Sequence, residues 1–313
     1  MDTLFFEGPE NEKVLKLTEK QMVGITTAMA GRHNMLMFGA PGCGKTLVGS
    51  NLGILRPELT KEESQSVTRI HSLAGLRKAN DAVREAPFRM PHQTATIEGM
   101  CGGGPNIHPG EISLAHNGIL FLDEVSEFKT SVLQMLRVPL ESNSITLSRA
   151  GRSVVYPADF QLIMTASPCP CGNYGTPGKT CLCSARSIEQ YWKKFSSPLL
   201  DRIEVKLDFN EPESNKQEYK IGHLRSLVSK AISAQRKRGF YNGGMTADML
   251  DEYCPVDADA EKALSKTESL PSRVRQNIIK VARTVADMHQ VEVIDRECVE
   301  TAIGLCAPKS LSY

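Results

Sequence analysis

The residues with the clearest chemical purpose lie between Gly39 and Thr46, where GAPGCGKT matches the pattern G-x-x-x-x-G-K-[ST]. The apolar run NMLMFGA predicts a buried strand before this loop, and a helix is expected from about Lys45. Glycines let backbone N–H groups turn inward around phosphate oxygens, while Lys45 would reach the β- and γ-phosphates and Thr46 would bind Mg²⁺. The expected nucleotide-binding residues are Gly39, Ala40, Pro41, Gly42, Cys43, Gly44, Lys45, Thr46 and Leu47.

A second apolar run, GILFLDE, ends in two acidic residues, Asp123 and Glu124. Ligands of α/β proteins bind at the carboxyl ends of parallel strands, so this pair is expected beside the phosphate loop. Asp123 would contribute to the Mg²⁺ shell, and Glu124 would polarise the attacking water. The alternative for Glu124 is a solvated acid at the start of a helix.

Two C-x-C pairs form the third candidate site, with Cys169 and Cys171 in one pair and Cys181 and Cys183 in the other. Four thiolates can form a tetrahedral Zn²⁺ site, although the usual spacing within a pair is C-x₂₋₄-C. Glycines and a proline between the pairs let the chain fold back. The stretch is too polar to hold itself by core burial, which favours a metal. A redox-active thiol pair and an unliganded loop remain the alternatives.

The whole chain has 313 residues, of which 41% are hydrophobic, and a net charge of +1. This composition favours one large or two modest globular domains, and no apolar run approaches the ~20 residues of a membrane-spanning helix. The N-terminus lacks the pattern of a secretory signal. Nine cysteines, an odd number, argue against a disulfide framework and favour a reducing, cytoplasmic location.

Three apolar runs predict buried strands: NMLMFGA, GILFLDE and DFQLIMTAS. A capping box at Thr18 and Gln21 predicts a helix that ends near Gly31, a plausible left-handed residue. Residues 57–112 are expected to be loops with one or two short helices, and FKTSVLQMLRVPLE (128–141) to be one helix. ITLSRAGRSVVYP predicts a hairpin with its turn at Gly151.

After residue 214 the pattern becomes helical. Alternating strands and helices followed by helices alone indicate an α/β domain with a parallel sheet, over residues 1–210, and a helical domain over residues 211–313. The helices expected there cover 215–238, 246–252, 258–267, 271–288 and 295–306.

Several distinct motifs follow one another along the chain: GAPGCGKT, PFRMPHQTAT, GGGPNIHPGEISLAHNGILFLDE, LSRAGRSVVYPADFQLI, PCPCG, SSPLLDRIE and SRVRQNIIKVARTVAD. In this order they resemble the motifs of the magnesium-chelatase-like AAA+ ATPases of the ComM/YifB type. The resemblance covers about residues 18–306. It implies a three-layer αβα P-loop core, a helical lid, hydrolysis of ATP with Mg²⁺, and a homo-oligomeric ring, most often a hexamer. Such chains normally carry a Lon-protease-like domain before the ATPase module, whereas this chain begins almost at the module.

The resemblance also implies roles for polar residues outside the two phosphate-site motifs. Arg202 matches the arginine finger that reaches the neighbouring subunit, with a surface pairing to Asp201 or Glu204 as the alternative. Arg273 matches the sensor-2 arginine, with Arg275 as the second choice. The sensor-1 position, usually Asn, is Ser167 here, so that turnover would be slow or Thr165 would share the role.

Residues 88–110 and 145–156 match a helix-2 insert and a hairpin that point into the ring's pore. Arg149 and Arg152 flank the hairpin tip, where they would meet DNA phosphates or form a solvated turn. The favoured function is an ATP-driven motor that remodels DNA, with helicase or branch-migration activity. A motor that remodels a protein partner, and a slow nucleotide-dependent switch or scaffold, are the alternatives.

Overall fold

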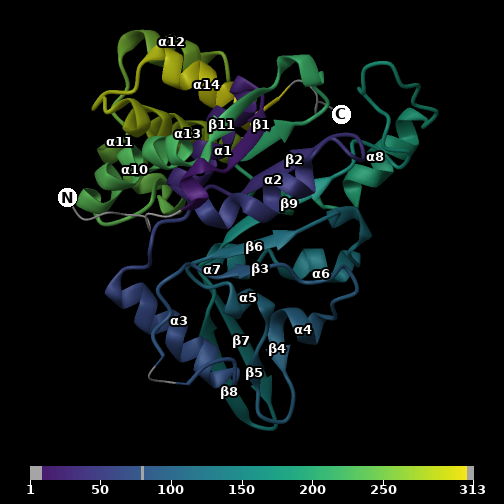
Figure 1. Ribbon diagram of the computed structural model, residues 1–313, viewed down its shortest axis with the longest axis vertical. Coiled ribbons are helices and arrows are strands. Elements are labelled where there is room, and N and C mark those ends of the chain that lie inside the picture. Colours follow the sequence, from purple (N-terminus) through teal and green to yellow (C-terminus); the bar gives the residue numbers. More distant parts are fainter. Residues whose placement is uncertain (1–8, 79–80, 309–313) are drawn as a thin grey trace. The chain divides into compact units, whose positions relative to one another are not determined.

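The computed structural model describes residues 9–78 and 81–308 (Figure 1). Over these residues the chain forms two compact units. The central unit comprises Thr46–Cys171 and Leu182–Arg202, and the terminal unit comprises residues 9–45, Gly172–Cys181 and residues 203–308. These units are defined by packing, and the division into a nucleotide-binding domain and a lid at residue 210 stays a prediction.

A parallel five-stranded sheet forms the core, and its strand order is β10-β2-β9-β6-β3. The three predicted strands are confirmed, and each is buried along its whole length, as the continuous apolar runs required. Two short parallel strands, β3 and β10, were not predicted. The bounds are β2 (Met35–Phe38), β3 (Phe88–Arg89), β6 (Ile119–Leu122), β9 (Gln161–Ala166) and β10 (Val205–Asp208).

The helices of the central unit correct two expectations. Residues 57–112 contain a helix of 13 residues, α3 (Lys61–Leu73), which begins with a capping box between Thr60 and Glu63. The single helix expected over 128–141 is two helices, because Pro139 has no N–H to donate and its ring clashes with the carbonyl of the residue four positions earlier. The helices are α2 (Lys45–Asn51), α3, α4 (Ile97–Cys101), α5 (Glu111–Leu114), α6 (Thr130–Met135), α7 (Pro139–Ser142), α8 (Ala185–Lys193) and α9 (Ser197–Leu200).

The predicted hairpin is confirmed, with β7 (Ser144–Arg149) antiparallel to β8 (Arg152–Pro157). Its turn places Ala150 at φ 47° and Gly151 at φ 77°, the left-handed pair that a two-residue hairpin turn requires. A second, smaller hairpin pairs β4 (Gly102–Gly103) with β5 (His108–Pro109) inside the segment matched to the insert.

The first α-helix of the terminal unit is α1 (Glu19–Gly31), whose capping box at Thr18 and Gln21 is confirmed. Gly31 is the last residue of this helix, and the left-handed residue that follows is Arg32, at φ 55°. The helix expected over 215–238 is also corrected: it begins at Ile221, because Gln217–Lys220 instead form β11, which pairs antiparallel with β1 (Val14–Leu17).

Five helices make up most of the terminal unit's C-terminal part (Figure 1). Their apolar faces supply its core; Ile278, Val281 and Val285 of α13 are at most 2% exposed. No helix in the described part of the chain is both long and apolar enough to cross a membrane. The helices are α10 (Ile221–Arg238), α11 (Ala247–Tyr253), α12 (Ala258–Ser265), α13 (Ser272–His289) and α14 (Arg296–Cys306); the short 3₁₀ turns are Pro9–Glu12, Leu52–Leu55, Val125–Glu127, Glu213–Asn215 and Asn242–Gly244.

Candidate active site

The phosphate loop follows β2 and has its lysine already turned toward its own backbone. Lys45 is 8% exposed. Its Nζ donates to the carbonyl oxygens of Gly39, at 2.7 Å, and Ala40, at 2.9 Å. Gly42 and Gly44 have φ of 81° and 95°, so the loop needs glycine at both positions for its backbone conformation. The loop therefore closes around the ammonium group of its own lysine.

Contacts from later in the chain fix this loop. The backbone N–H of Ala40 donates to Asn210 Oδ1 over 2.8 Å, and Thr176 Oγ1 donates to the same oxygen over 3.3 Å. Lys216 Nζ donates to the Cys43 carbonyl oxygen over 3.4 Å. Asn210, Thr176 and Lys216 were not predicted as part of the site. Asn210 follows the carboxyl end of β10, where parallel sheets place polar groups toward a ligand, but this strand was not itself predicted and so gave no signal for it.

The oxygen ligands expected for Mg²⁺ lie together in the central unit. Thr46 Oγ1 is 3.0 Å from both carboxylate oxygens of Asp123, although 77 residues separate them in sequence. Thr165 Oγ1 donates to Asp123 Oδ1 over 2.6 Å. A hydroxyl and a carboxylate held this close form a donor set that suits Mg²⁺. The residues present thus fit the ion that the sequence predicts.

Glu124 is exposed and has left-handed backbone angles, φ 50° and ψ 54°. Its backbone N–H donates to Thr165 Oγ1 over 2.8 Å. One hydroxyl, on Thr165, therefore holds both the Asp123 carboxylate and the Glu124 backbone. Because the Glu124 side chain is accessible to solvent, its carboxylate can accept a proton from a water molecule.

Ser167 lies just beyond the end of β9 and is half-buried. Its carbonyl oxygen accepts a hydrogen bond of 2.9 Å from the hydroxyl of Tyr191. Arg273 and Arg275 are exposed in the first turn of α13. The sensor roles of Ser167 and Arg273 stay predictions.

Arg202 is almost fully buried, with 8% of its side chain exposed. Its guanidinium forms an ion pair with Glu141, in α7, and donates to the carbonyl oxygen of Pro198. Glu141 is thus an acidic partner that sequence spacing did not indicate, since the residues considered were Asp201 and Glu204. The finger role of Arg202 stays a prediction.

The two hairpin arginines face each other across the turn. Arg149 and Arg152 are register partners at the ends of β7 and β8, and both are exposed. Next to them Ser148 Oγ lies 3.2 Å from Ser153 Oγ. The hairpin therefore presents two positive charges and two hydroxyls at one end.

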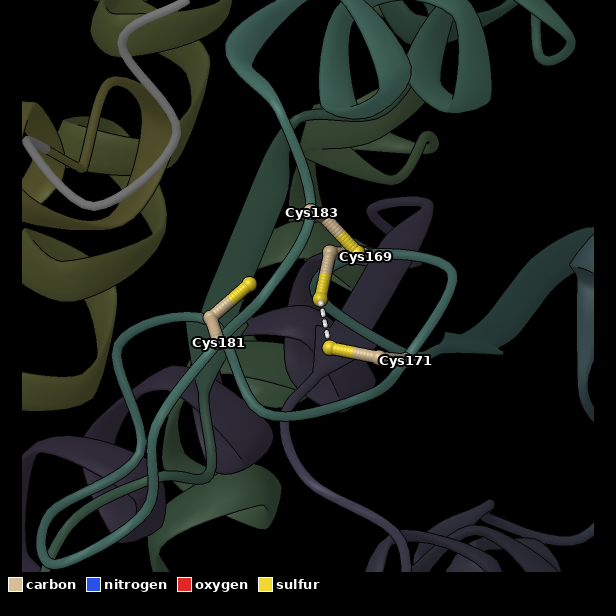
Figure 2. Close-up of side chains that lie close together, drawn as sticks. All are labelled: Cys169, Cys171, Cys181 and Cys183. Carbon is tan, nitrogen blue, oxygen red and sulfur yellow. Dashed lines mark hydrogen bonds between the residues drawn. The ribbon is translucent and has the colours of Figure 1, made fainter.

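The two C-x-C pairs come together in the structure. The Sγ atoms of Cys169, Cys171, Cys181 and Cys183 all lie within 4.8 Å of one another, so this cluster could hold a metal ion. Figure 2 shows the four side chains gathered where the two arms of the loop meet. None of the nine cysteines, all of which lie within the described residues, forms a disulfide.

Three features together define a P-loop protein of the AAA+ class. They are the phosphate loop between β2 and α2, the acidic pair at the end of β6, and the strand order β10-β2-β9-β6-β3. The chain belongs to the magnesium chelatase family. The family model described as magnesium chelatase, subunit ChlI, matches residues 13–217, and the model of its C-terminal part matches residues 221–305.

Two relatives that each match 90% of the chain support this assignment. The chain is 36% identical over 291 residues to the uncharacterized protein YifB of Escherichia coli (strain K12), with 90% of this chain and 57% of YifB covered. It is 37% identical over 292 residues to the competence protein ComM of Haemophilus influenzae, again with 90% and 57% covered. The chain therefore spans 57% of the length of these relatives. A match to the magnesium-chelatase 67 kDa subunit of Chlorobaculum parvum covers 69 residues at 30% identity.

Proposed function

We propose that the chain hydrolyses ATP with the help of Mg²⁺. The observation that carries this proposal is that the Thr165 hydroxyl hydrogen-bonds both the Asp123 carboxylate and the Glu124 backbone N–H. Thr46 Oγ1 lies 3.0 Å from the Asp123 carboxylate. In this arrangement the carboxylate that would bind the metal and the solvent-accessible side chain that would act as base belong to consecutive residues. Membership of the magnesium chelatase family supports the same activity.

Each residue of the site would have a distinct task. Lys45 would exchange its bonds to the loop carbonyls for bonds to the phosphates, and the loop N–H groups would hold the phosphate oxygens. Thr46 and Asp123 would hold Mg²⁺, which neutralises charge on the β- and γ-phosphates when it is bound. Glu124 would orient the attacking water and accept its proton.

We further infer that the chain works in a homo-oligomeric ring, most simply a hexamer, in the cytoplasm, and that it remodels DNA. The exposed Arg149 and Arg152 at the tip of the hairpin support contact with phosphates. The likeness to ComM, named a competence protein, points the same way. A net charge of +1 makes such binding a local property of the hairpin and not of the whole surface.

The test of this function is the ATP hydrolysis rate with no DNA, and with single-stranded, duplex and branched DNA, at two salt concentrations. We expect DNA to raise the rate at low salt and to lose its effect as salt rises, because phosphate contacts release counterions. Arg149→Gln/Arg152→Gln should lose the stimulation, whereas the control Lys61→Gln/Arg84→Gln, at exposed positions of the same unit, should retain it. Hydrolysis that no DNA stimulates would contradict the DNA proposal and leave the ATPase intact.

Replacing Thr165 by Val should lower the hydrolysis rate about tenfold or more and raise the Mg²⁺ concentration needed for half-maximal rate. Valine keeps the shape of threonine but cannot hold Asp123 and Glu124, and hydrogen bonds to charged groups contribute about 1.5–3 kcal/mol. Thr165→Ser retains the hydroxyl and should stay near the wild-type Mg²⁺ requirement. A fall in melting temperature with an unchanged Mg²⁺ requirement would show that Thr165 only supports the fold.

A further inference from the structure

The loop that carries the two C-x-C pairs lacks the usual means of holding a fixed shape. Among residues 170–187, Gly172 alone is buried, and the side chains on either side of it are half-buried or exposed. Leu182, between two of the cysteines, is 90% exposed. No strand or helix crosses the segment between β9 and α8. Because a loop of this length gains little from apolar burial, something else must offset the entropy of ordering it.

Tight turns return the second cysteine pair to the first. Gly172, Gly175 and Gly178 have φ of 76°, 69° and 72°, a conformation that glycine adopts without strain. Backbone bonds from Thr176 N–H to the Asn173 carbonyl, at 3.1 Å, and from Lys179 N–H to the Thr176 carbonyl, at 3.2 Å, close two of these turns. The sequence between the pairs is therefore built to bring four thiols together.

The sulfur positions match those of a tetrahedral thiolate site. All four Sγ atoms lie within 4.8 Å of one another, and those of Cys169 and Cys171 are 3.4 Å apart (Figure 2). Zinc–sulfur bonds of about 2.3 Å in a tetrahedron separate the sulfurs by about 3.8 Å. A small adjustment of each side chain would therefore complete the coordination. Soft thiolate ligands in this number select Zn²⁺ over the oxygen-seeking Mg²⁺ and Ca²⁺.

We propose that Cys169, Cys171, Cys181 and Cys183 bind one structural Zn²⁺. Four protein ligands would fill the coordination sphere and leave no position for water or substrate, which is the mark of a structural and not a catalytic zinc site. The proposal depends on the cysteine geometry and on the loop that carries it, and stands apart from the proposed ATPase activity.

The neighbouring contacts show what the ion would hold in place. Cys169 is fully buried and follows Ser167 and Pro168, whose carbonyl oxygens accept bonds of 2.9 Å from the Tyr191 hydroxyl and 3.1 Å from Trp192 Nε1. Cys183 directly precedes Ser184, the N-cap of α8. The ion would thus join the end of β9 to the beginning of α8, the helix that already holds the backbone at Ser167.

The first test measures metal in the full chain purified without chelator and under reducing conditions. We expect one zinc per chain by elemental analysis, falling to near zero in Cys181→Ser/Cys183→Ser and unchanged in the control Cys101→Ser, a half-buried thiol outside the cluster. Titration of the metal-free protein with Co²⁺ should give the thiolate charge-transfer and d–d absorption bands of a tetrahedral site. Wild-type protein with no zinc and no such bands would overturn the proposal, as would a disulfide within the cluster found by mass spectrometry of protein kept reduced.

A second test reports on the loop itself. Lys179 is exposed in the middle of the segment, so trypsin can cut after it once the loop opens. We expect chelation of the metal, or the Cys181→Ser/Cys183→Ser change, to speed cleavage at Lys179 about tenfold or more, and added Zn²⁺ to reverse only the effect of chelation. Cleavage at Lys179 that is equally fast with and without metal would contradict a structural role for the ion.

Discussion

Glu124→Gln should lower the ATP hydrolysis rate by about 10²–10⁴-fold, the usual contribution of a positioned general base, while ATP still binds. Glutamine keeps the size of the side chain and the backbone bond from residue 124 to Thr165, which is 2.8 Å long. It cannot accept a proton from water, so only the chemical step should suffer. Single-turnover hydrolysis and equilibrium binding of ATP, measured on the same preparation, separate these two effects.

The matched control is Glu127→Gln, at an exposed acid three positions further along the same turn. This variant removes an equal charge close to the site without touching the proposed base, so its hydrolysis rate should stay near wild type. Equal rates in Glu124→Gln and wild-type protein, or an equal loss in both variants, would remove Glu124 from the role of base.

Arg202→Ala should reduce hydrolysis by about 10³–10⁵-fold if the guanidinium acts on a neighbouring subunit's site, as arginine fingers do. Within one chain the guanidinium is paired with Glu141, a residue 53% exposed. The control is therefore Glu141→Gln, which breaks the ion pair and keeps the arginine, and whose hydrolysis rate should stay near wild type. Should Glu141→Gln reproduce the loss of hydrolysis, the function of Arg202 would be its ion pair.

Mixing two inactive variants gives the sharper result. When Arg202→Ala and Glu124→Gln chains are combined in equal amounts, about a quarter of the interfaces in a mixed ring unite an intact base with an intact arginine from the next chain. Hydrolysis should then reappear in the mixture, although neither variant hydrolyses ATP alone. Failure to recover activity, in rings shown by mass to contain both chains, would exclude a finger supplied by the neighbour.

The parts of the fold that could be predicted from the sequence are those that depend on short, continuous segments. The capping box at Thr18, the buried strand before Asp123 and the turn at Gly151 all depend on residues within a few positions of one another. The pairing of β1 with β11 joins segments about 200 residues apart, so the sequence around Gln217 gave no sign of a strand. Pro139 was a local signal, since its ring alone predicts a break at the end of α6.

In the candidate site too, some residues could be predicted from the sequence and their supporting contacts could not. The site residues in the two motifs could be predicted from residue type and spacing: Lys45, Thr46, Asp123 and Glu124. The structure brings Thr46 close to Asp123. The supporting contacts of Asn210 with the phosphate loop and of Glu141 with Arg202 join residues 170 and 61 positions apart. Polar side chains at such separations carry no pattern in one sequence, so only the fold can show these partners.

The left-handed backbone of Glu124 has a consequence for attempts to make this protein more robust. A residue with a long side chain held at φ 50° costs about 1–2 kcal/mol relative to ordinary helical geometry, whereas asparagine tolerates that geometry well. The substitution that best relieves the backbone at position 124 is thus one that removes the proposed base. If Glu124 is the base that we propose, a thermostability screen that never measures turnover would favour variants that bind ATP without hydrolysing it. Stability and catalysis would then compete at this residue.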